Sequence, residues 1–241
     1  MLESARALLG PVYPGPARWL LGKVLEFAMR ITRLRDYDDY RLEDVHGMPI
    51  LVLPSVANPK LLRTGAFFAA CIDSRLVAPG SEVLDLGTGS GVCALFAARH
   101  AGRVVAVDIN RAAIRCAGIN AAMNHLERKI ELRLGDLFAP VAGQRFDLVL
   151  FNPPFLLGVP KDDRDAAWKS SDAATRFAAN LAQHLKANGA ALLLLSSFGN
   201  ACAMFVDELV ARGYTLSVFA RRRFINETVT VLRVVPPGAA S

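Results

Sequence analysis

Hydrophobic and polar residues follow two alternating patterns over most of the chain. Short apolar runs predict strands, and segments whose apolar residues recur every three or four positions predict helices. From Glu82 onward the two alternate, with strands predicted over 83–86, 104–107, 130–134, 146–151 and 190–195, and helices over 92–100, 111–124, 171–187 and 200–212. Strands that alternate with helices in this way indicate a parallel sheet with helices on both faces.

Two further apolar runs, 215–222 and 227–235, follow without a helix between them. Consecutive strands with a short connection pair antiparallel, because a parallel pair requires a long crossover. The whole pattern therefore predicts an α/β fold with a doubly wound, mostly parallel sheet.

The first part of the chain has a different pattern. Apolar residues with helical spacing predict a helix over 17–35, and two short strands are predicted over 41–45 and 49–53. Asn58-Pro59 has the residues of a helix start, so a helix is predicted from there to about residue 76. We therefore expect an N-terminal helical extension with short strands over residues 1–50, and one α/β domain over residues 51–241.

Composition narrows the class of protein. Hydrophobic residues make up 53% of the chain and charged residues 21%, which favours a packed globular domain over a disordered chain. No apolar run reaches the roughly 18 residues of a membrane helix, and the first residues lack a signal-peptide pattern, so a cytoplasmic protein is expected. The net charge of +6 favours an acidic partner such as RNA or a ribosome-bound protein, and is equally typical of simple solubility.

Cysteines and histidines lack the spacing of a metal site. Cys71, Cys93, Cys116 and Cys202 lie in apolar surroundings and form no C-x-x-C pair, and the four histidines are scattered. We expect reduced cysteines in the core and no structural metal.

The strongest chemical signal is a glycine-rich turn at the end of a predicted strand. Asp85 is followed by Gly87, Thr88, Gly89 and Gly91 in the pattern Asp-x-Gly-x-Gly-x-Gly. Glycines let the backbone turn sharply and approach a ligand beyond the carboxyl end of the strand. The dinucleotide fingerprint G-x-G-x-x-G has another spacing, and an acid here would repel a pyrophosphate. The acid suits the cationic ammonium group of S-adenosylmethionine, with a purely structural turn as the alternative.

Two further acids stand at the ends of the next predicted strands. Asp108 can accept hydrogen bonds from both ribose hydroxyls of a nucleoside, with Ile109 beside it. Asp136 is placed to accept the adenine amino group, with Leu137 or Phe138 against the ring. A helix cap is the commoner role of any one such acid, but three at successive strand ends favour a nucleoside site. These residues predict S-adenosyl-L-methionine as the cofactor.

The fourth predicted strand runs into Asn152-Pro153-Pro154-Phe155. Two prolines fix φ and remove two backbone donors, so the turn is stiff and presents oxygen acceptors. The side-chain oxygen of Asn152 and the carbonyl oxygen of Pro153 can accept both hydrogens of one NH2 group, and Phe155 can stack on the flat group that carries it. Such a nitrogen is a poor nucleophile, so acceptors that aim its lone pair at a sulfonium methyl would serve catalysis without a base or a metal. We expect these four residues to be catalytic and Asn152 also to contact the cofactor.

These motifs resemble those of class I S-adenosylmethionine-dependent methyltransferases of the Asn-Pro-Pro-aromatic type. The resemblance covers about residues 50–235 and is greatest to the HemK-type protein-glutamine methyltransferases that modify release factors. It includes Ala166-Ala167-Trp168 and the ending over 224–229. The resemblance implies a seven-stranded sheet whose last strand is antiparallel, and methylation of a glutamine side-chain amide in a protein such as a release factor. Arg63 and Thr64 are candidates for the methionine end of the pocket.

Other activities stay open. Phe155 stands where the glutamine enzymes typically carry Tyr, and related enzymes with this motif methylate adenine N6 or guanine N2 in RNA or DNA, on a base flipped into the pocket. Basic clusters at Arg221-Arg222-Arg223, 18–35 and 161–169 would help to hold phosphates, but neighbouring side chains on a strand point to opposite faces. A small-molecule amine and a catalytically silent binding subunit are further alternatives, whereas the glycine spacing opposes a nicotinamide-dependent oxidoreductase.

Overall fold

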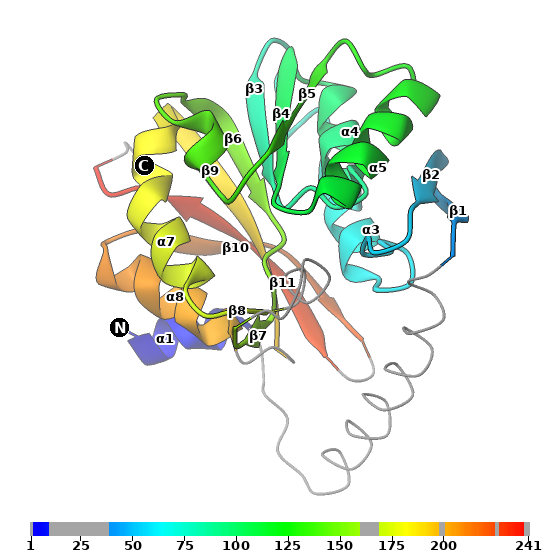
Figure 1. Ribbon diagram of the computed structural model, residues 1–241. Coiled ribbons are helices and arrows are strands. Elements are labelled where there is room, and N and C mark those ends of the chain that lie inside the picture. The colour runs from blue at the N-terminus through cyan, green and yellow to red at the C-terminus, as the bar shows by residue number, and fades with distance from the viewer. Residues whose placement is uncertain (1, 10–38, 160–168, 198–200, 225–226, 239–241) are drawn as a thin grey trace, which may run out of the picture.

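Figure 1 shows the computed structural model of the chain, which describes residues 2–9, 39–159, 169–197, 201–224 and 227–238. A seven-stranded sheet in the order β10-β11-β9-β6-β3-β4-β5 forms its centre. Its strands are β3 (Glu82–Leu86), β4 (Arg103–Asp108), β5 (Ile130–Leu134), β6 (Phe146–Phe151), β9 (Leu185–Ser196), β10 (Thr215–Arg223) and β11 (Thr228–Val235). The helix predicted over 17–35 and the motif Ala166-Ala167-Trp168 lie outside the described residues.

Strand pairing confirms the predicted topology. Parallel pairs join β5, β4, β3, β6 and β9, whereas β11 runs antiparallel to both β9 and β10. The chain enters the sheet at β3, adds β4 and β5 on one side, and then crosses to β6 on the other. This reversal of strand order creates a crevice at the carboxyl ends of β3 and β6, where open α/β sheets bind their ligands.

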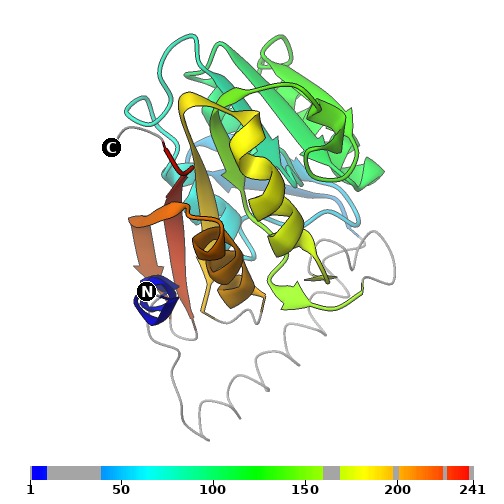
Figure 2. The ribbon, with the colours of Figure 1, turned by 90° about the vertical axis from the view of Figure 1, so that its left-hand side faces the viewer.

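Helices cover both faces of the sheet (Figures 1 and 2). One face packs against α3 (Thr64–Ala70), α4 (Val92–Ala98), α5 (Arg111–Met123) and the hairpin of β1 (Arg41–Val45) and β2 (Met48–Val52). The other packs against α7 (Ala173–Asn180), the 3₁₀-helix η3 (Leu181–His184) and α8 (Cys202–Ala211), with α1 (Leu2–Arg6) against α8. The smaller elements are η1 (Ala7–Leu9), η2 (Ala139–Val141) and the short parallel pair of β7 (Leu156–Leu157) and β8 (Lys169–Ser170). Burial on both faces explains why the central strands read as continuous apolar runs.

The hairpin of β1 and β2 straddles the predicted domain boundary at residue 50. Ile50 and Val52 are buried in the same core as the sheet and α5. The side-chain amide of Asn120 in α5 accepts the N–H of Leu51 and donates to its carbonyl oxygen, both at 2.7 Å. We therefore propose that the α/β domain begins with β1.

The helix predicted from Asn58 onward is wrong in its start and its length. The side-chain oxygen of Asn58 does accept the backbone N–H groups of Lys60 and Leu61, both at 3.0 Å. The chain then stays in turns until Arg63, whose φ of 61° is left-handed and cannot continue a right-handed helix. The helix α3 begins only at Thr64 and has seven residues. The local cap signal is present, but a left-handed residue separates it from the helix.

The helix predicted over 171–187 is wrong at its end, because α7 stops at Asn180 and is followed by η3 and β9. In a longer α-helix the N–H of Ala182 would donate to the carbonyl oxygen of Ala178. The buried hydroxyl of Tyr214 bonds to both groups instead. It donates to the carbonyl oxygen of Ala178 at 3.0 Å and accepts the N–H of Ala182 at 2.9 Å. A side chain distant in sequence therefore replaces the helical hydrogen bond and ends the helix.

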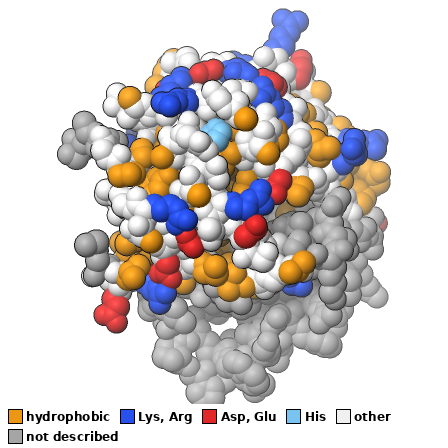
Figure 3. Space-filling model, turned by 60° about the vertical axis from the view of Figure 1, so that its left-hand side comes forward, with side chains coloured by type: hydrophobic (Ala, Val, Ile, Leu, Met, Phe, Trp, Pro, Cys, Tyr) orange, Lys and Arg blue, Asp and Glu red, His pale blue; other side chains and the backbone are white. Residues whose placement is uncertain are grey.

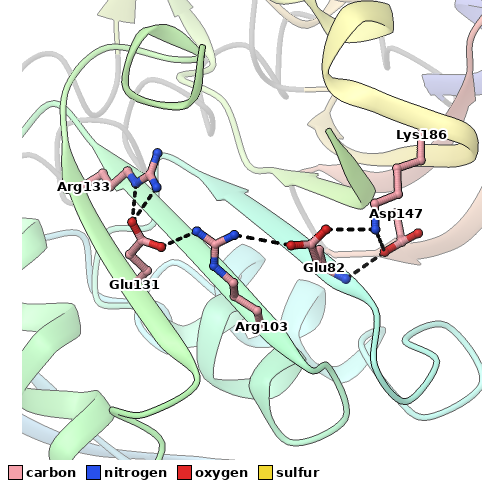
Figure 4. Close-up of polar contacts among 6 residues, drawn as sticks. All are labelled: Glu82, Arg103, Glu131, Arg133, Asp147 and Lys186. Carbon is pink, nitrogen blue, oxygen red and sulfur yellow. Dashed lines mark hydrogen bonds and ion pairs between the residues drawn. The ribbon is translucent and has the colours of Figure 1, made fainter. Parts of the chain in front are cut away.

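An ionic network crosses the sheet near the amino ends of its parallel strands, at the opposite edge from the crevice (Figure 4). Arg103 of β4 lies between Glu82 of β3 and Glu131 of β5 and pairs with both. Lys186 of β9 bridges Glu82 and Asp147 of β6, at 2.9 and 2.8 Å. The side chains are partly exposed, so solvent screens each pair, but together they link five neighbouring strands.

Within the described parts of the chain, no helix has the length and apolar character needed to cross a membrane. The same residues contain no group of three or more His, Cys, Asp or Glu side chains arranged to hold a metal ion. All four cysteines are free thiols, three of them buried and Cys71 partly buried.

Candidate active site

A cavity of about 290 Å³ opens at the carboxyl ends of β3, β4, β5 and β6. Its volume lies at the lower end of the roughly 300–1,000 Å³ that is usual for small-molecule sites. The carboxyl ends of parallel strands meet at one edge of a sheet, which brings together residues far apart in sequence. The predicted site residues in its walls are Asp85, Gly87, Thr88, Gly89, Asp108, Ile109, Asp136, Leu137, Asn152, Pro153, Pro154 and Phe155.

The glycine-rich turn has the backbone that its sequence predicts. Gly87, Gly89 and Gly91 have φ angles of 62°, 56° and 83°, a region that residues with a Cβ rarely adopt. Gly91, predicted as a cofactor residue, is not among the cavity walls. A Cβ at this position would lie 2.9 Å from the Cβ of Ala117, so Gly91 instead lets the turn pack closely against α5.

Asp85 is buried beneath the turn and ties it to α4. One oxygen of its carboxyl group accepts the hydroxyl of Thr88 at 2.6 Å and the backbone N–H of Ala94 at 3.1 Å. Burial disfavours the charged form and raises the pKa of this carboxyl to about 7. A positively charged ligand in the cavity would favour the ionised form.

Asp108 connects the glycine-rich turn to the start of α5. Its two carboxylate oxygens accept the backbone N–H groups of Gly89 and Asn110, each at 2.8 Å. The cap of α5 is Asn110, whose side-chain oxygen accepts the N–H of Ala112 at 2.8 Å. Each oxygen of a carboxylate has a second lone pair, so Asp108 can still accept hydroxyl groups of a ligand.

Asp136 and Leu137 line the cavity beyond β5. The carboxylate of Asp136 accepts a hydrogen bond from the guanidinium of Arg176 at 2.7 Å. Phe138 is buried in the core, where its ring stacks on that of His184 with centroids 4.5 Å apart. Of the two residues predicted beside an adenine ring, Leu137 lines this cavity and Phe138 does not.

Asn152 stands beside the glycine-rich turn because of the register between β3 and β6. Phe151 pairs with Leu86, so the residues that follow, Asn152 and Gly87, leave neighbouring strands at the same level. The side-chain oxygen of Asn152 is buried and has no hydrogen-bond partner among the described residues. A buried acceptor without a partner is costly, and the missing partner is expected to be a ligand.

The turn Asn152-Pro153-Pro154-Phe155 is anchored to both halves of the core. Phe155 is partly buried and packs against the apolar residues on both faces of the sheet. Its carbonyl oxygen accepts the N–H of Ala201, the residue that precedes α8, at 3.0 Å. The turn is therefore held at both ends, by β6 before it and by α8 after it.

Some cavity residues are not evident from the sequence. Ser55, Asn110 and Arg176 line the cavity, and Asn110 donates to the carbonyl oxygen of Ser55 at 3.0 Å. Asn110 carries a helix-cap signal, but nothing local to Arg176 or Ser55 indicates a site. Of the two residues predicted at the methionine end, Thr64 lines the cavity, whereas the Arg63 guanidinium lies over the ring of Phe224.

The predicted basic cluster Arg221-Arg222-Arg223 lies on the edge strand β10. Arg221 donates to the carbonyl oxygen of Leu8, while the Arg222 guanidinium lies 5.3 Å from the ring centroid of Phe224. On the face shown in Figure 3, Lys and Arg side chains lie among Asp and Glu side chains. Neither observation favours a continuous groove for a nucleic acid.

Known proteins resemble the chain in sequence. The family model of the methyltransferase small domain matches residues 58–214, more than half of the chain. Ribosomal protein L11 methyltransferase of Pelotomaculum thermopropionicum is 36% identical over 172 residues, covering 63% of this chain and 54% of the relative. Release factor glutamine methyltransferase of Gloeobacter violaceus is 32% identical over 167 residues, covering 62% and 58%. The chain thus spans a little over half of the length of these two curated relatives.

A solved structure shares the fold. The crystal structure of ribosomal protein L11 methylase from Lactobacillus delbrueckii subsp. bulgaricus matches with a TM-score of 0.57 at 22% identity, covering 76% of this chain and 84% of that one. The family model covers the strands and turns that build the cavity, from Asn58 to the residue before β10. The chain therefore belongs to the methyltransferase small domain family and has the fold of class I S-adenosylmethionine-dependent methyltransferases.

Proposed function

We propose that the protein is an S-adenosylmethionine-dependent N-methyltransferase that modifies the side-chain amide of glutamine in a protein. The observation that carries the proposal is the buried, unpartnered oxygen of Asn152 beside the glycine-rich turn. It is the acceptor that a substrate NH2 group requires at the point where the methyl group would arrive.

S-Adenosylmethionine suits the order of chemical groups around the cavity. Asp85 and Asp108 both line the cavity, where Asp85 would receive the cationic ammonium and Asp108 would accept the ribose hydroxyls. Asp136 would accept the adenine amino group, and Leu137 would pack against the face of the ring. Ile109, which also lines the cavity, would contact the cofactor. The three acids lie at or just beyond the carboxyl ends of the neighbouring strands β3, β4 and β5, so their order along the cavity would match the order of groups in the cofactor.

The reaction needs orientation and charge stabilisation from the protein. When bound, S-adenosylmethionine would supply the methyl group: the amide nitrogen would attack it, the N–C bond would form as the S–C bond broke, and the bonding pair would leave with sulfur as a neutral thioether. An amide lone pair is delocalised, so the acceptors at Asn152 and Pro153 would hold the NH2 group and stabilise the positive charge that develops on it. The nitrogen then loses a proton to solvent. Phe155 would stack on the flat amide.

Two curated relatives whose names give protein substrates support a protein acceptor. The two curated relatives described above are a ribosomal protein methyltransferase and a release factor glutamine methyltransferase. The mixed charges on the face in Figure 3 give no comparable support to a nucleic acid. A glutamine in a translation protein would place the enzyme in the cytoplasm.

Methyl transfer from radiolabelled S-adenosylmethionine in a cell extract tests the acceptor. We expect label that protease removes and nuclease leaves in place. Label released by nuclease would overturn the protein acceptor in favour of a base amine. Calorimetry with S-adenosylhomocysteine and with NAD tests the cofactor, and binding of NAD alone would end the methyltransferase proposal.

Two variants separate chemistry from cofactor binding. Asn152→Ala should lose turnover by about 10²–10³-fold, because one transition-state acceptor is removed, while it should still bind S-adenosylhomocysteine. Asp108→Ala should instead weaken binding of S-adenosylhomocysteine. Asn188→Ala, at an exposed position of β9 away from the cavity, is the matched control and should change neither. Full turnover by Asn152→Ala would remove that residue from the mechanism.

A further inference from the structure

An ion pair joins two cavity residues that lie 40 positions apart in sequence. Arg176 Nη1 lies 2.7 Å from Asp136 Oδ2 and 3.8 Å from Asp172 Oδ2. Arg176 belongs to the first half of α7, and Asp136 follows β5. Both side chains are partly exposed at the cavity wall, with 42% and 44% of their surfaces accessible, so a ligand can reach them.

The backbone on both sides of Asp136 is held in unusual conformations. Gly135 has a φ of 154° and Leu137 a φ of 47°, and the latter is uncommon for a residue with a branched side chain. The N–H of Gly135 donates to the carbonyl oxygen of Asp108 at 2.9 Å, and a Cβ at Gly135 would lie 2.4 Å from Cγ of Pro140. Strained backbone of this kind persists where neighbouring contacts hold it, and it clusters at ligand-binding positions.

The pair also separates two cavities. Asp136, Leu137 and Arg176 line the candidate active site on one side. The same three residues line a second cavity of about 500 Å³ toward η3 on the other side. An arginine that bridges the wall in this way fixes one oxygen of Asp136 and leaves the other available, because a carboxylate offers about four acceptor positions.

We infer that Arg176 is a positioning residue that orients Asp136 so that its free oxygen accepts the exocyclic amino group of the adenine ring. The inference rests on the proposed function, since it assigns the adenine end of the same site. It makes Arg176 a determinant of cofactor specificity, although its own guanidinium need not touch the cofactor. A carboxylate aimed at this position accepts from an amino group and repels a carbonyl oxygen.

The position of Arg176 also ties the cofactor end to the catalytic turn. The helix α7 follows β8, which pairs with β7 directly after Phe155. The strand β7, which follows the catalytic turn, therefore pairs with the strand that leads into α7. Arg176 of α7 in turn bonds to Asp136, in the loop that would hold adenine.

The test compares two ligands that differ at this one position. S-Adenosylhomocysteine carries the amino group, and S-inosylhomocysteine has a carbonyl oxygen in its place. Calorimetry should show that wild type prefers the adenosine form on the order of 10- to 100-fold, the range expected for a hydrogen bond to a charged group. Arg176→Met should lower this ratio at least about threefold, and Arg176→Lys should lower it less, because Lys keeps the charge but not the fork geometry.

Controls separate positioning from general damage to the fold. Arg145→Met removes an arginine from the second cavity and should leave the ratio unchanged. Thermal unfolding of each variant shows whether it folds. If Arg176→Met does not fold, the ligand comparison is made with Arg176→Lys. A wild-type ratio in a folded Arg176 variant overturns the inference. Wild type that binds both ligands equally also overturns it, whereas wild type that binds neither overturns the proposed function itself.

Discussion

At the scale of single residues, the fold leaves a buried polar atom of the site without a partner among the described residues. The buried oxygen of Asn152 has no described partner, and such an acceptor costs about 1–3 kcal/mol when nothing bonds to it. Leu137 adds a left-handed φ in the same cavity wall. Folds retain unfavourable groups of this kind mainly at functional positions, where a ligand supplies the missing contact.

Asp85 should make stability depend on pH. Its pKa is about 7 in the fold because it is buried, and it is near 3.8 when exposed. The folded protein therefore holds a proton between about pH 4 and pH 7 that the unfolded chain has released. The stability contribution of Asp85 is fully present below about pH 4 and is lost as pH rises to about 7, by up to about 4 kcal/mol.

Urea unfolding of wild type and Asp85→Asn over this pH range measures the effect. The stability of wild type relative to the variant should fall as pH rises and should level off above about pH 7. Parallel pH curves for the two proteins would show that Asp85 is not buried as a neutral acid. Saturating S-adenosylhomocysteine should reduce the slope, because its ammonium group favours the ionised carboxyl.

Secondary-structure elements divide into those that local pattern predicts and those that it does not. The strands predicted over 130–134 and 146–151 coincide with β5 and β6, and the helix over 111–124 agrees with α5 to one residue. The strand β6 lies in the middle of the sheet and is largely buried, β5 is a partly buried edge strand, and α5 packs on one face of the sheet. In each element the hydrophobic periodicity of the sequence follows the burial that its place in the fold imposes. The predictions for α3 and α7 are wrong because a single residue that hydrophobic periodicity does not reveal sets where each helix begins or ends. For α3 it is Arg63 with its left-handed φ, and for α7 it is the hydroxyl of Tyr214.

Tyr214→Phe tests the ending of α7. The substitution leaves the buried carbonyl of Ala178 and N–H of Ala182 without the hydroxyl that bonds to both. We expect a loss of about 2 kcal/mol in the free energy of unfolding, measured by urea denaturation at an unchanged m-value. Tyr40→Phe, at an exposed tyrosine before β1, should change stability little. An unchanged midpoint for Tyr214→Phe would mean that the hydroxyl does not determine where the helix ends.

On the scale of the whole molecule, the candidate binding cavity and the ionic network between strands lie at opposite edges of the sheet. The cavity lies at the carboxyl ends of the parallel strands, and the ionic network of Figure 4 lies near their amino ends. Changes to the network should therefore affect stability without affecting the site.

Arg103→Met tests this separation. Arg103 pairs with Glu82 and Glu131, but the side chains are partly exposed, so we expect a loss of no more than about 1 kcal/mol. The difference from wild type should shrink in about 0.5 M salt, because screening weakens exposed ion pairs. Arg115→Met, at an exposed position of α5, is the control without this salt dependence. A large change in the affinity for S-adenosylhomocysteine would contradict the independence of the two edges.

The sequence by itself determined the mostly parallel sheet, its antiparallel last strand, the glycine-rich turn and the acids at successive strand ends. These features follow from periodic burial and from backbone preferences of neighbouring residues, which are properties of short segments. Tertiary structure alone decided that Arg176 meets Asp136, that Tyr214 ends α7, and that Gly91 packs against α5. Each is a contact between segments far apart in sequence, and its geometry exists only after the helices have packed on the sheet.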